Sequence, residues 1–298
     1  MKNKRKILGV SSGACYGVIL VCVIGIIVGS FLDFQINEAL ANVTTVGANF
    51  AAYGSYISYC LYPAAGMCLY LGLKKKGFPL AGKLLLLVGW FLAVYYTNSY
   101  SGSKVRGWFG YAAGESSPWI SVLSWLIIAA LYVWPMIVCY KVLDDANSDK
   151  LIAVGVIILL AGVLSDSVNV WLKQVASRPR YKYLLTLEDS AGEYRDWWQM
   201  VPNLAGNNDN YKSWPSGNMT IAAMLFSLPL LTDSLKKRSE TKNIVAFVMA
   251  SLFVALYAYN RIHMTNHFLS DVCFGTLITY LIFVVMSKAF LQKVYEVK

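Results

Sequence analysis

Long apolar runs alternate with short polar segments along the whole chain, and each run is long enough to cross a membrane as a helix. A bilayer core of about 30 Å requires about 20 apolar residues in a helix. On this rule the sequence predicts eight spans, at residues 7–32, 48–73, 79–97, 118–140, 151–172, 216–233, 243–260 and 270–290. The expected fold class is an all-α integral membrane protein, with residues 1–298 forming a single transmembrane helical bundle.

Three segments near the predicted spans need separate interpretation. The third span is the weakest, because its strong apolar run, Leu84–Tyr96, is short and Lys83 must reach an interface. Residues 33–45 have apolar positions at helical spacing, which fit an amphipathic interfacial helix as well as an ordinary loop. The basic start, Met1–Lys6, resembles a signal peptide, but the apolar run that follows is too long and lacks a small-residue cleavage site. We therefore expect an uncleaved first span.

Composition supports a membrane protein and excludes other classes. Of the 298 residues, 57% are hydrophobic and 14% are charged, and the mean hydropathy is +0.51. A soluble globule would need more polar residues to cover its surface. The formal net charge of +10 indicates basic cytoplasmic loops and attraction to anionic headgroups, so no nucleic-acid partner is expected. The six cysteines lie in apolar segments without metal-site spacing, and two histidines are too few for a His-rich metal cluster.

The distribution of Lys and Arg gives the predicted bundle an orientation. With the N-terminus in the cytoplasm, eight spans place Lys74–Lys76, Lys236–Lys242 and the C-terminus on the cytoplasmic side. The loop at 173–215, rich in Tyr and Trp at the headgroup level, and the turn at Arg261 then lie on the extracytoplasmic side. Basic residues on the extracytoplasmic side depart from the usual bias of Lys and Arg toward the cytoplasm, and anion binding would explain their position. We expect a bacterial plasma membrane, and the sidedness depends on the third span.

Two polar clusters at the edges of apolar runs combine basic residues with a helix start. In Lys173–Arg180, arginine can hold a phosphate through two hydrogen bonds while lysine adds a point charge. The alternative is a basic flank that anchors the helix end. In Trp214–Asn218, a Pro-Ser-Gly sequence opens the sixth span, where free N–H groups can bind an anion. The alternative is a simple helix cap.

A third cluster, Arg261–Asp271, contains a His and an Asp four residues apart. If the eighth helix already begins there, His267 and Asp271 lie on one face and the carboxylate can hold the imidazole. One ring nitrogen is then free to act as a base or a nucleophile. An Asp at the start of a span is costly and favours a function, although a structural His–Asp pair is the alternative.

In their order and at these helix edges, the clusters resemble the three motifs of the type 2 phosphatidic-acid phosphatase superfamily, K-x6-R-P, P-S-G-H and S-R-x5-H-x3-D. Lys173 with Arg180 matches the first motif, and Pro215–Gly217 matches most of the second. Arg261, His267 and Asp271 match the third. The resemblance implies a six-helix phosphatase core, with the catalytic part at about residues 151–290 and some preceding helices, to which further spans are added.

The resemblance also implies roles for the matched residues. His267 would attack phosphorus and become a phosphohistidine, with Asp271 orienting it. No metal and no other cofactor is implied, and the partner would be a phosphorylated lipid in the membrane. The phosphoryl oxygens would be held by Lys173, Arg180, Ser216, the backbone N–H of Gly217, and Arg261.

The sequence departs from these motifs at Tyr181, at Asn260 and most seriously at Asn218, where the family has the His that protonates the leaving group. Loss of general acid catalysis typically costs about 10²- to 10⁴-fold. Asn218 therefore indicates an engineered trap, an enzyme for a good leaving group such as an isoprenoid diphosphate of the undecaprenyl diphosphate kind, or a non-catalytic protein that binds or transports lipid phosphate. His263 is either a substitute acid or a loop residue outside the site. We expect a membrane-embedded phosphatase acting on a lipid phosphate or isoprenoid diphosphate.

Overall fold

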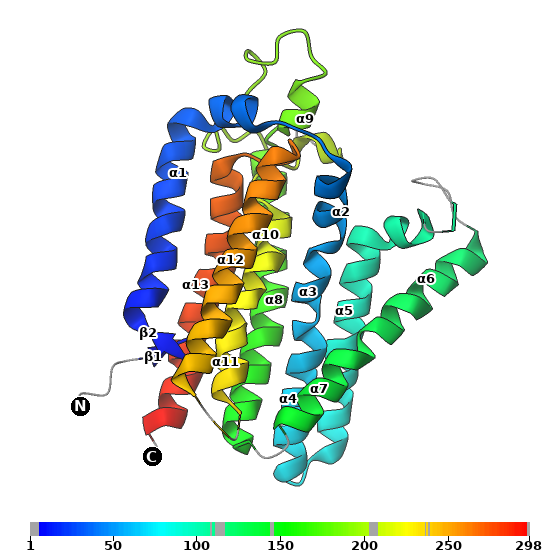
Figure 1. Ribbon diagram of the computed structural model, residues 1–298, viewed down its shortest axis with the longest axis vertical. Coiled ribbons are helices and arrows are strands. Elements are labelled where there is room, and N and C mark those ends of the chain that lie inside the picture. Colours follow the sequence, from blue (N-terminus) through cyan, green and yellow to red (C-terminus); the bar gives the residue numbers. More distant parts are fainter. Residues whose placement is uncertain are drawn as a thin grey trace.

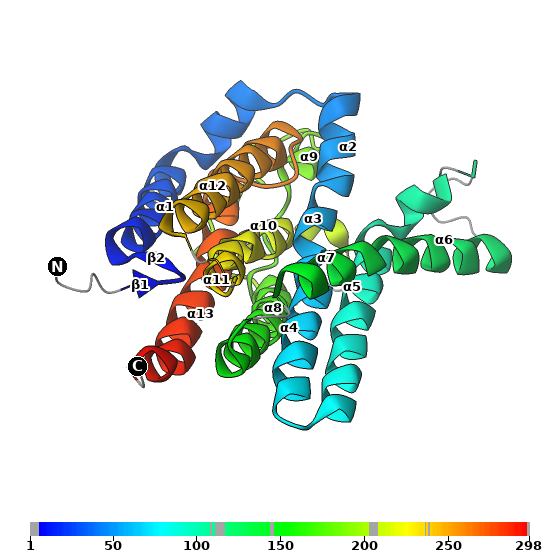
Figure 2. The same cartoon turned by 60° about the horizontal axis from the view of Figure 1, so that its bottom comes forward.

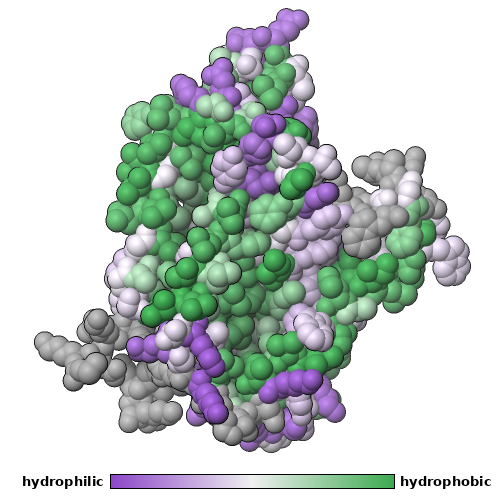
Figure 3. Space-filling model, in the orientation of Figure 1, coloured by the Kyte–Doolittle hydropathy of each residue, from purple (hydrophilic) through white to green (hydrophobic). Residues whose placement is uncertain are grey.

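The chain folds into one bundle of long helices that run side by side (Figure 1). The computed structural model describes residues 6–107, 109–110, 117–143, 146–202, 208–235, 237 and 239–296. Within these ranges, seven helices are long and apolar enough to cross a membrane. Apolar side chains cover the middle of the visible face, and hydrophilic side chains gather toward its two ends (Figure 3). The prediction of an all-α integral membrane protein is therefore confirmed.

A short antiparallel hairpin, β1 (Lys6–Ile7) and β2 (Val10–Ser11), leads into the first span, α1 (Ser12–Leu40). This helix runs unbroken to Leu40, so residues 33–40 form neither a separate interfacial helix nor a loop. The reason is that the polar residues Asp33 and Asn37 are buried against the start of the last span. Asp33 Oδ1 accepts a hydrogen bond from the backbone N–H of Ser270 at 3.0 Å, so its polarity does not mark a boundary with water.

The next three spans lie on one side of the bundle. The second span, Thr45–Lys75, is divided into three helices, and the predicted third span is confirmed at Pro79–Ser99. The two pack closely because Gly66 and Gly89 leave room for the neighbouring backbone. The fourth span projects away from the rest of the bundle at its α6 end (Figure 2). The helices are α2 (Thr45–Tyr53), α3 (Ser55–Tyr59), α4 (Leu61–Lys75), α5 (Pro79–Gly107), α6 (Pro118–Leu131) and α7 (Val133–Leu143).

The remaining helices pack around α8 (Ser148–Ala176), which contacts α4, α10 and α13. The sixth predicted span is present as three short consecutive helices rather than one, and it is therefore not among the seven. Its course changes through a 3₁₀ turn, after which Pro229 cannot donate a backbone hydrogen bond. These elements are α10 (Gly217–Ala222), η2 (Ala223–Ser227), α11 (Leu228–Asp233), α12 (Glu240–His263) and α13 (Leu269–Glu296).

The two ends of the bundle carry different structures. The β1–β2 hairpin and the C-terminal end of α13 lie at the same end, as an even number of crossings requires (Figure 1). At the opposite end lie α9 (Tyr181–Leu184) and the 3₁₀ turn η1 (Asp209–Tyr211). All three polar clusters identified in the sequence lie beneath this second end.

Candidate phosphate site

Two long helices, α8 and α12, end at this site, and a residue in the left-handed conformation follows each of them. Ser177 has a φ of 45° and Thr265 a φ of 57°. Pro179 then prevents α8 from continuing. The two exits are joined by a hydrogen bond from the Lys182 N–H to the Thr265 carbonyl at 2.8 Å. These turns bring the chain segments after α8 and after α12 together.

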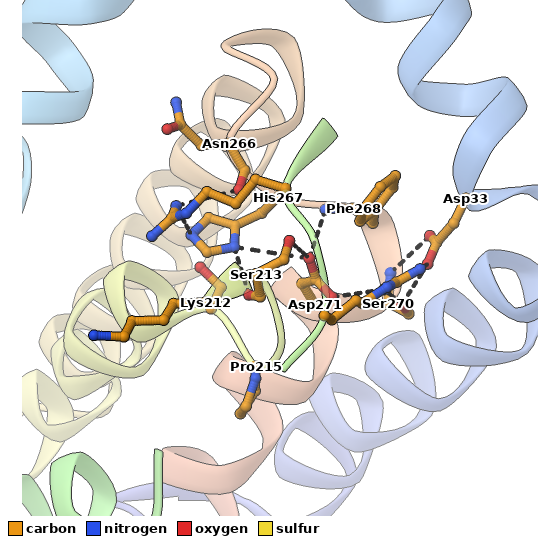
Figure 4. A network of polar contacts seen from close by, with 12 residues as sticks. Asp33, Lys212, Ser213, Pro215, Asn266, His267, Phe268, Ser270 and Asp271 are labelled. Carbon is orange, nitrogen blue, oxygen red and sulfur yellow. Dashed lines mark hydrogen bonds and ion pairs between the residues drawn. The ribbon is translucent and has the colours of Figure 1, made fainter. Parts of the chain in front are cut away.

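His267 lies at the centre of the site, in the loop before α13 rather than on the first turn of that helix. Its Nδ1 is 2.8 Å from the carbonyl oxygen of Ser213, and a carbonyl only accepts hydrogen bonds. Nδ1 therefore carries the proton, and Nε2 keeps a free lone pair. Nε2 lies 3.4 Å from Nη1 of Arg180. The ring and its partners are drawn in Figure 4.

The environment of His267 keeps its imidazole neutral. Burial lowers the pKa of His267 well below its ordinary value, and the positive charges of Arg180, Arg261 and Lys173 lower it further. Asp271 opposes this effect. The backbone also brings these cations near the ring, since the His267 N–H donates to the Arg261 carbonyl at 3.3 Å and Lys173 binds the carbonyl of Lys212, the residue before Ser213.

Asp271 supports the histidine mainly through the serine that holds it. Its Oδ2 is 3.7 Å from Nδ1 of His267, too far for a hydrogen bond. The same oxygen accepts hydrogen bonds from Ser213 Oγ at 2.5 Å and from the Phe268 N–H at 2.9 Å. The Asp271 carbonyl also accepts the N–H of Ser216 at 3.0 Å. Sequence reasoning missed Ser213, because a serine just before the second cluster carries no signal of its own.

Arg178 is part of the framework of the site and has no group left for a ligand. It is 1% exposed, and a guanidinium has five N–H donors. All five find acceptors, which are Arg195 O at 2.8 Å, Ser270 Oγ at 2.9 Å, Asp271 Oδ1 at 2.7 Å, Asp33 Oδ2 at 3.0 Å and the Tyr194 hydroxyl at 2.9 Å. Asp33 was also not identified from the sequence.

Arg180 faces the imidazole and is held from behind by Asp209. Its Nε donates to the Asp209 carbonyl and its Nη2 to Asp209 Oδ1, both at 2.8 Å. Burial alone would raise the pKa of Asp209, but the charges of Arg180 and Lys182 hold it below its ordinary value. Nη1 is left on the side of His267, where it also donates to the Asn266 carbonyl at 3.3 Å.

Arg261 and Ser216 carry buried polar atoms without partners. Arg261 is 6% exposed and Ser216 is 0% exposed. Neither Arg261 Nε nor Ser216 Oγ has a hydrogen-bond partner in the part of the chain that the structure describes. A buried cation without compensation is costly. An anion bound beside either atom would supply the acceptor that it lacks.

Lys173 and Gly217 lie against each other beside these groups. The Lys173 ammonium donates to the Lys212 carbonyl at 2.7 Å. A Cβ on Gly217 would lie 3.6 Å from Lys173 Cε and 3.0 Å from Asn169 Oδ1. Glycine thus keeps the backbone at the start of α10 open to the lysine.

Asn218, the next residue, contacts α12. Its Nδ2 is 3.4 Å from the hydroxyl of Tyr257, and that hydroxyl donates to the Ala51 carbonyl at 2.9 Å. His263 has a different neighbourhood, because its Nδ1 contacts the Leu40 carbonyl at 2.8 Å and its ring stacks on Tyr259. Among the described residues, no group of three or more His, Cys, Asp and Glu side chains could hold a metal ion.

The helices and the site define an integral membrane protein with buried cations around a neutral histidine. Residues 150–295 match the family model described as PAP2 superfamily, so the chain carries a PAP2 superfamily domain that extends from α8 to α13. The resemblance expected from the three motifs is confirmed at the level of this domain. Neither the curated proteins nor the solved structures include a match to the chain. The PAP2 superfamily implies substrates that are phosphate esters.

Proposed function

We propose that the protein is a membrane-embedded phosphatase that hydrolyses a lipid phosphate or an isoprenoid diphosphate. The observation that carries the proposal is the pairing of an unprotonated, buried imidazole nitrogen, Nε2 of His267, with the unsatisfied donors of Arg261 and Ser216. A nucleophile surrounded by unpaired donors fits a phosphoryl group, whose oxygens accept hydrogen bonds while its phosphorus is attacked.

In the proposed reaction, Nε2 of His267 attacks phosphorus and the bond to the leaving oxygen breaks, with its electron pair passing to that oxygen. The phosphohistidine ring then carries a positive charge, which Asp271 stabilises from 3.7 Å while the Ser213 carbonyl accepts the hydrogen bond that Nδ1–H donates. Water attacks the phosphorus next, the P–N bond breaks, and inorganic phosphate leaves with His267 restored. Lys173, Arg180, Arg261, Ser216 and the Gly217 N–H hold the phosphoryl oxygens.

Asn218 favours a diphosphate as the substrate. It can donate a hydrogen bond to the leaving oxygen but has no proton to transfer. A lipid monophosphate must expel an alkoxide, which needs that proton, whereas a diphosphate expels a phosphate monoester that is stable as an anion. His263 does not supply the missing proton in this proposal, since its contacts are with the Leu40 carbonyl and the Tyr259 ring rather than with the groups around His267.

We place the site on the extracytoplasmic face and both termini in the cytoplasm. This rests on the basic residues at the end of the bundle opposite the site, which include Lys75, Lys76 and Lys150. A C-terminal green fluorescent protein fusion should fluoresce and a C-terminal alkaline phosphatase fusion should be inactive. The reverse pattern would contradict the orientation.

A second candidate is a protein that binds or transports a phosphorylated lipid without hydrolysing it. Asn218 is the observation that favours it, because every other group of the proposed site is present. Tight, salt-sensitive binding of the lipid, with no phosphohistidine, would distinguish this function from hydrolysis.

The test is phosphate release by purified protein from a diphosphate lipid and a monophosphate lipid. The parent should release phosphate faster from the diphosphate, and His267→Ala should abolish release. Asn218→His should raise the rate on the monophosphate by about 10²- to 10⁴-fold. Equal background release by the parent and His267→Ala would reject hydrolysis, and activity gained only with Asn218→His would indicate a disabled enzyme.

A further inference from the structure

An aspartate outside the PAP2 domain is built into the framework of the site. Asp33 lies on α1, whereas the domain covers residues 150–295. It is 1% exposed, and Oδ2 accepts Nη2 of Arg178 at 3.0 Å while Oδ1 accepts the N–H of Ser270 at 3.0 Å. The Ser270 hydroxyl also donates to Asp33. Figure 4 shows Asp33 at one edge of the network that leads to His267.

The charges in this chain of contacts do not cancel when both carboxylates are ionised. Arg178 brings one positive charge and lies between two carboxylates, Asp33 and Asp271, with Nη1 2.7 Å from Asp271 Oδ1. If Asp33 were neutral, Arg178 would compensate Asp271 alone and the cluster would carry no net charge. With Asp33 ionised, one negative charge remains beside the imidazole of His267.

We infer that Asp33 is a positioning residue that balances the charge of Arg178, so that the negative charge of Asp271 remains available to His267. The catalytic consequence rests on the proposed function, because it concerns the positive charge that forms on the ring when Nε2 bonds to phosphorus. Asp33 itself does not touch the substrate. The first helix, which precedes the domain, thus contributes to the reaction by charge.

The other charged groups that face His267 set the background for this effect. They come from every neighbouring segment: Asp271 from α13, Arg180 from the exit of α8, Arg261 from α12 and Lys173 from α8. Three are cations, so the ring is short of negative charge. Removing a carboxylate one contact beyond Asp271 should therefore lower kcat measurably. The expected change is about 10-fold at an effective dielectric constant near 20.

The experiment compares the pH dependence of phosphate release among charge variants. Asp33→Asn should lower kcat about 10-fold and move the acid limb to lower pH by about one unit, because the ring loses negative charge. Asp33→Glu keeps the charge and should retain the parent profile. The double variant Asp33→Asn with Arg178→Gln removes one charge of each sign, and its acid limb should return toward that of the parent. It also keeps the test available if Asp33→Asn alone does not fold.

The matched control is Asp233→Asn. Asp233 is 2% exposed and pairs with Lys150 at 2.6 Å, at the other end of the bundle, so it tests the loss of a buried carboxylate as such. It should leave the acid limb unchanged. Three results would overturn the role of Asp33. The acid limb of Asp33→Asn could stay where the parent has it, or Asp233→Asn could show the same shift. The double variant could also keep the shifted limb of Asp33→Asn.

A second readout separates this role from the proposed function. The chain has only two histidines, so ¹⁵N-histidine spectra in the presence of inorganic phosphate report the titration of His267 directly, with His263→Gln to assign the signals. Asp33→Asn should lower the pKa of His267, and Asp233→Asn should not. If the parent releases no more phosphate than His267→Ala, the proposed function fails, while the spectra still decide the role of Asp33. A pKa unchanged by Asp33→Asn would overturn it.

Discussion

The two ends of the bundle each bury an ionic cluster, and the clusters differ in what lies beside them. At the start of α8, Lys150 pairs with Asp233 at 2.6 Å, and Asn243 donates to Asp233 Oδ1 at 2.9 Å. At the other end, Arg178 uses all five of its donors inside the protein, yet Arg261 Nε nearby has no partner within the described residues. A saturated cluster fastens helices together, whereas an unsatisfied cation next to it is free to bind an anion.

Breaking the saturated cluster should have the largest effect. Arg178→Gln leaves two buried carboxylates facing each other, and removing one partner of a buried pair costs about 3–5 kcal/mol. The expected result is a large loss of stability, measured as thermal or denaturant unfolding in detergent. Stability equal to that of the parent would show that Arg178 is not the fastening residue.

Arg261→Gln should behave in the opposite way. It removes a buried charge whose Nε has no hydrogen-bond partner among the described residues, so stability should stay constant or rise. Binding of inorganic phosphate, measured by calorimetry, should weaken by about 10²-fold, as for the loss of one buried charge-assisted contact. If Arg261→Gln unfolds the protein as Arg178→Gln does, the contrast between the two arginines is false.

The pH dependence of turnover should sharpen the role of the unsatisfied cations. Burial and the nearby cations lower the pKa of His267 well below its ordinary value, so its imidazole is neutral throughout the neutral range. Activity should persist into mildly acidic solution and fall about 10-fold per pH unit below that lowered pKa. The unfolded protein binds a proton that the folded protein does not, so stability should also fall as pH drops below the ordinary value. An acid limb at the ordinary pKa of histidine would contradict this environment.

The smallest effect should come from the contact between Asn218 and α12. Tyr257→Phe deletes the hydroxyl that lies 3.4 Å from Asn218 Nδ2, a hydrogen bond of about 1 kcal/mol, so the rate of phosphate release should fall about fivefold. Tyr132→Phe is the control, since that buried hydroxyl pairs with Thr97 at 2.5 Å away from the proposed site. Equal rates of phosphate release by the two variants would show that the Tyr257 hydroxyl has no specific role at the site.

The features of the fold and of the site that depend on local sequence patterns could be predicted from the sequence. Apolar runs gave the spans, including the short third one, because crossing a membrane requires length and hydrophobicity. The three clusters came together at one end because they lie at the edges of spans that end on the same side. His267 and Asp271 were identified from their spacing in the third cluster.

Other features depend on contacts between distant segments and have no local signal. Asp33 resembled a helix boundary at the end of an apolar run, but its partner Arg178 is far away in the sequence. Ser213 takes the hydrogen bond of the His267 ring, which the spacing of His267 and Asp271 had suggested for Asp271. The break in the sixth span has a local cause instead, the 3₁₀ turn that Pro229 follows, and a hydropathy rule does not detect it.

The most direct test of the account is to look for phosphate bound covalently to His267. Without a proton donor at Asn218, the water that cleaves the phosphohistidine also lacks a general base, so the intermediate should accumulate. After rapid mixing with a ³²P-labelled diphosphate lipid, the parent and His263→Gln should carry acid-labile, base-stable label, and His267→Gln should carry none. Label that survives in His267→Gln, or phosphate release by the parent without any labelled protein, would contradict His267 as the nucleophile.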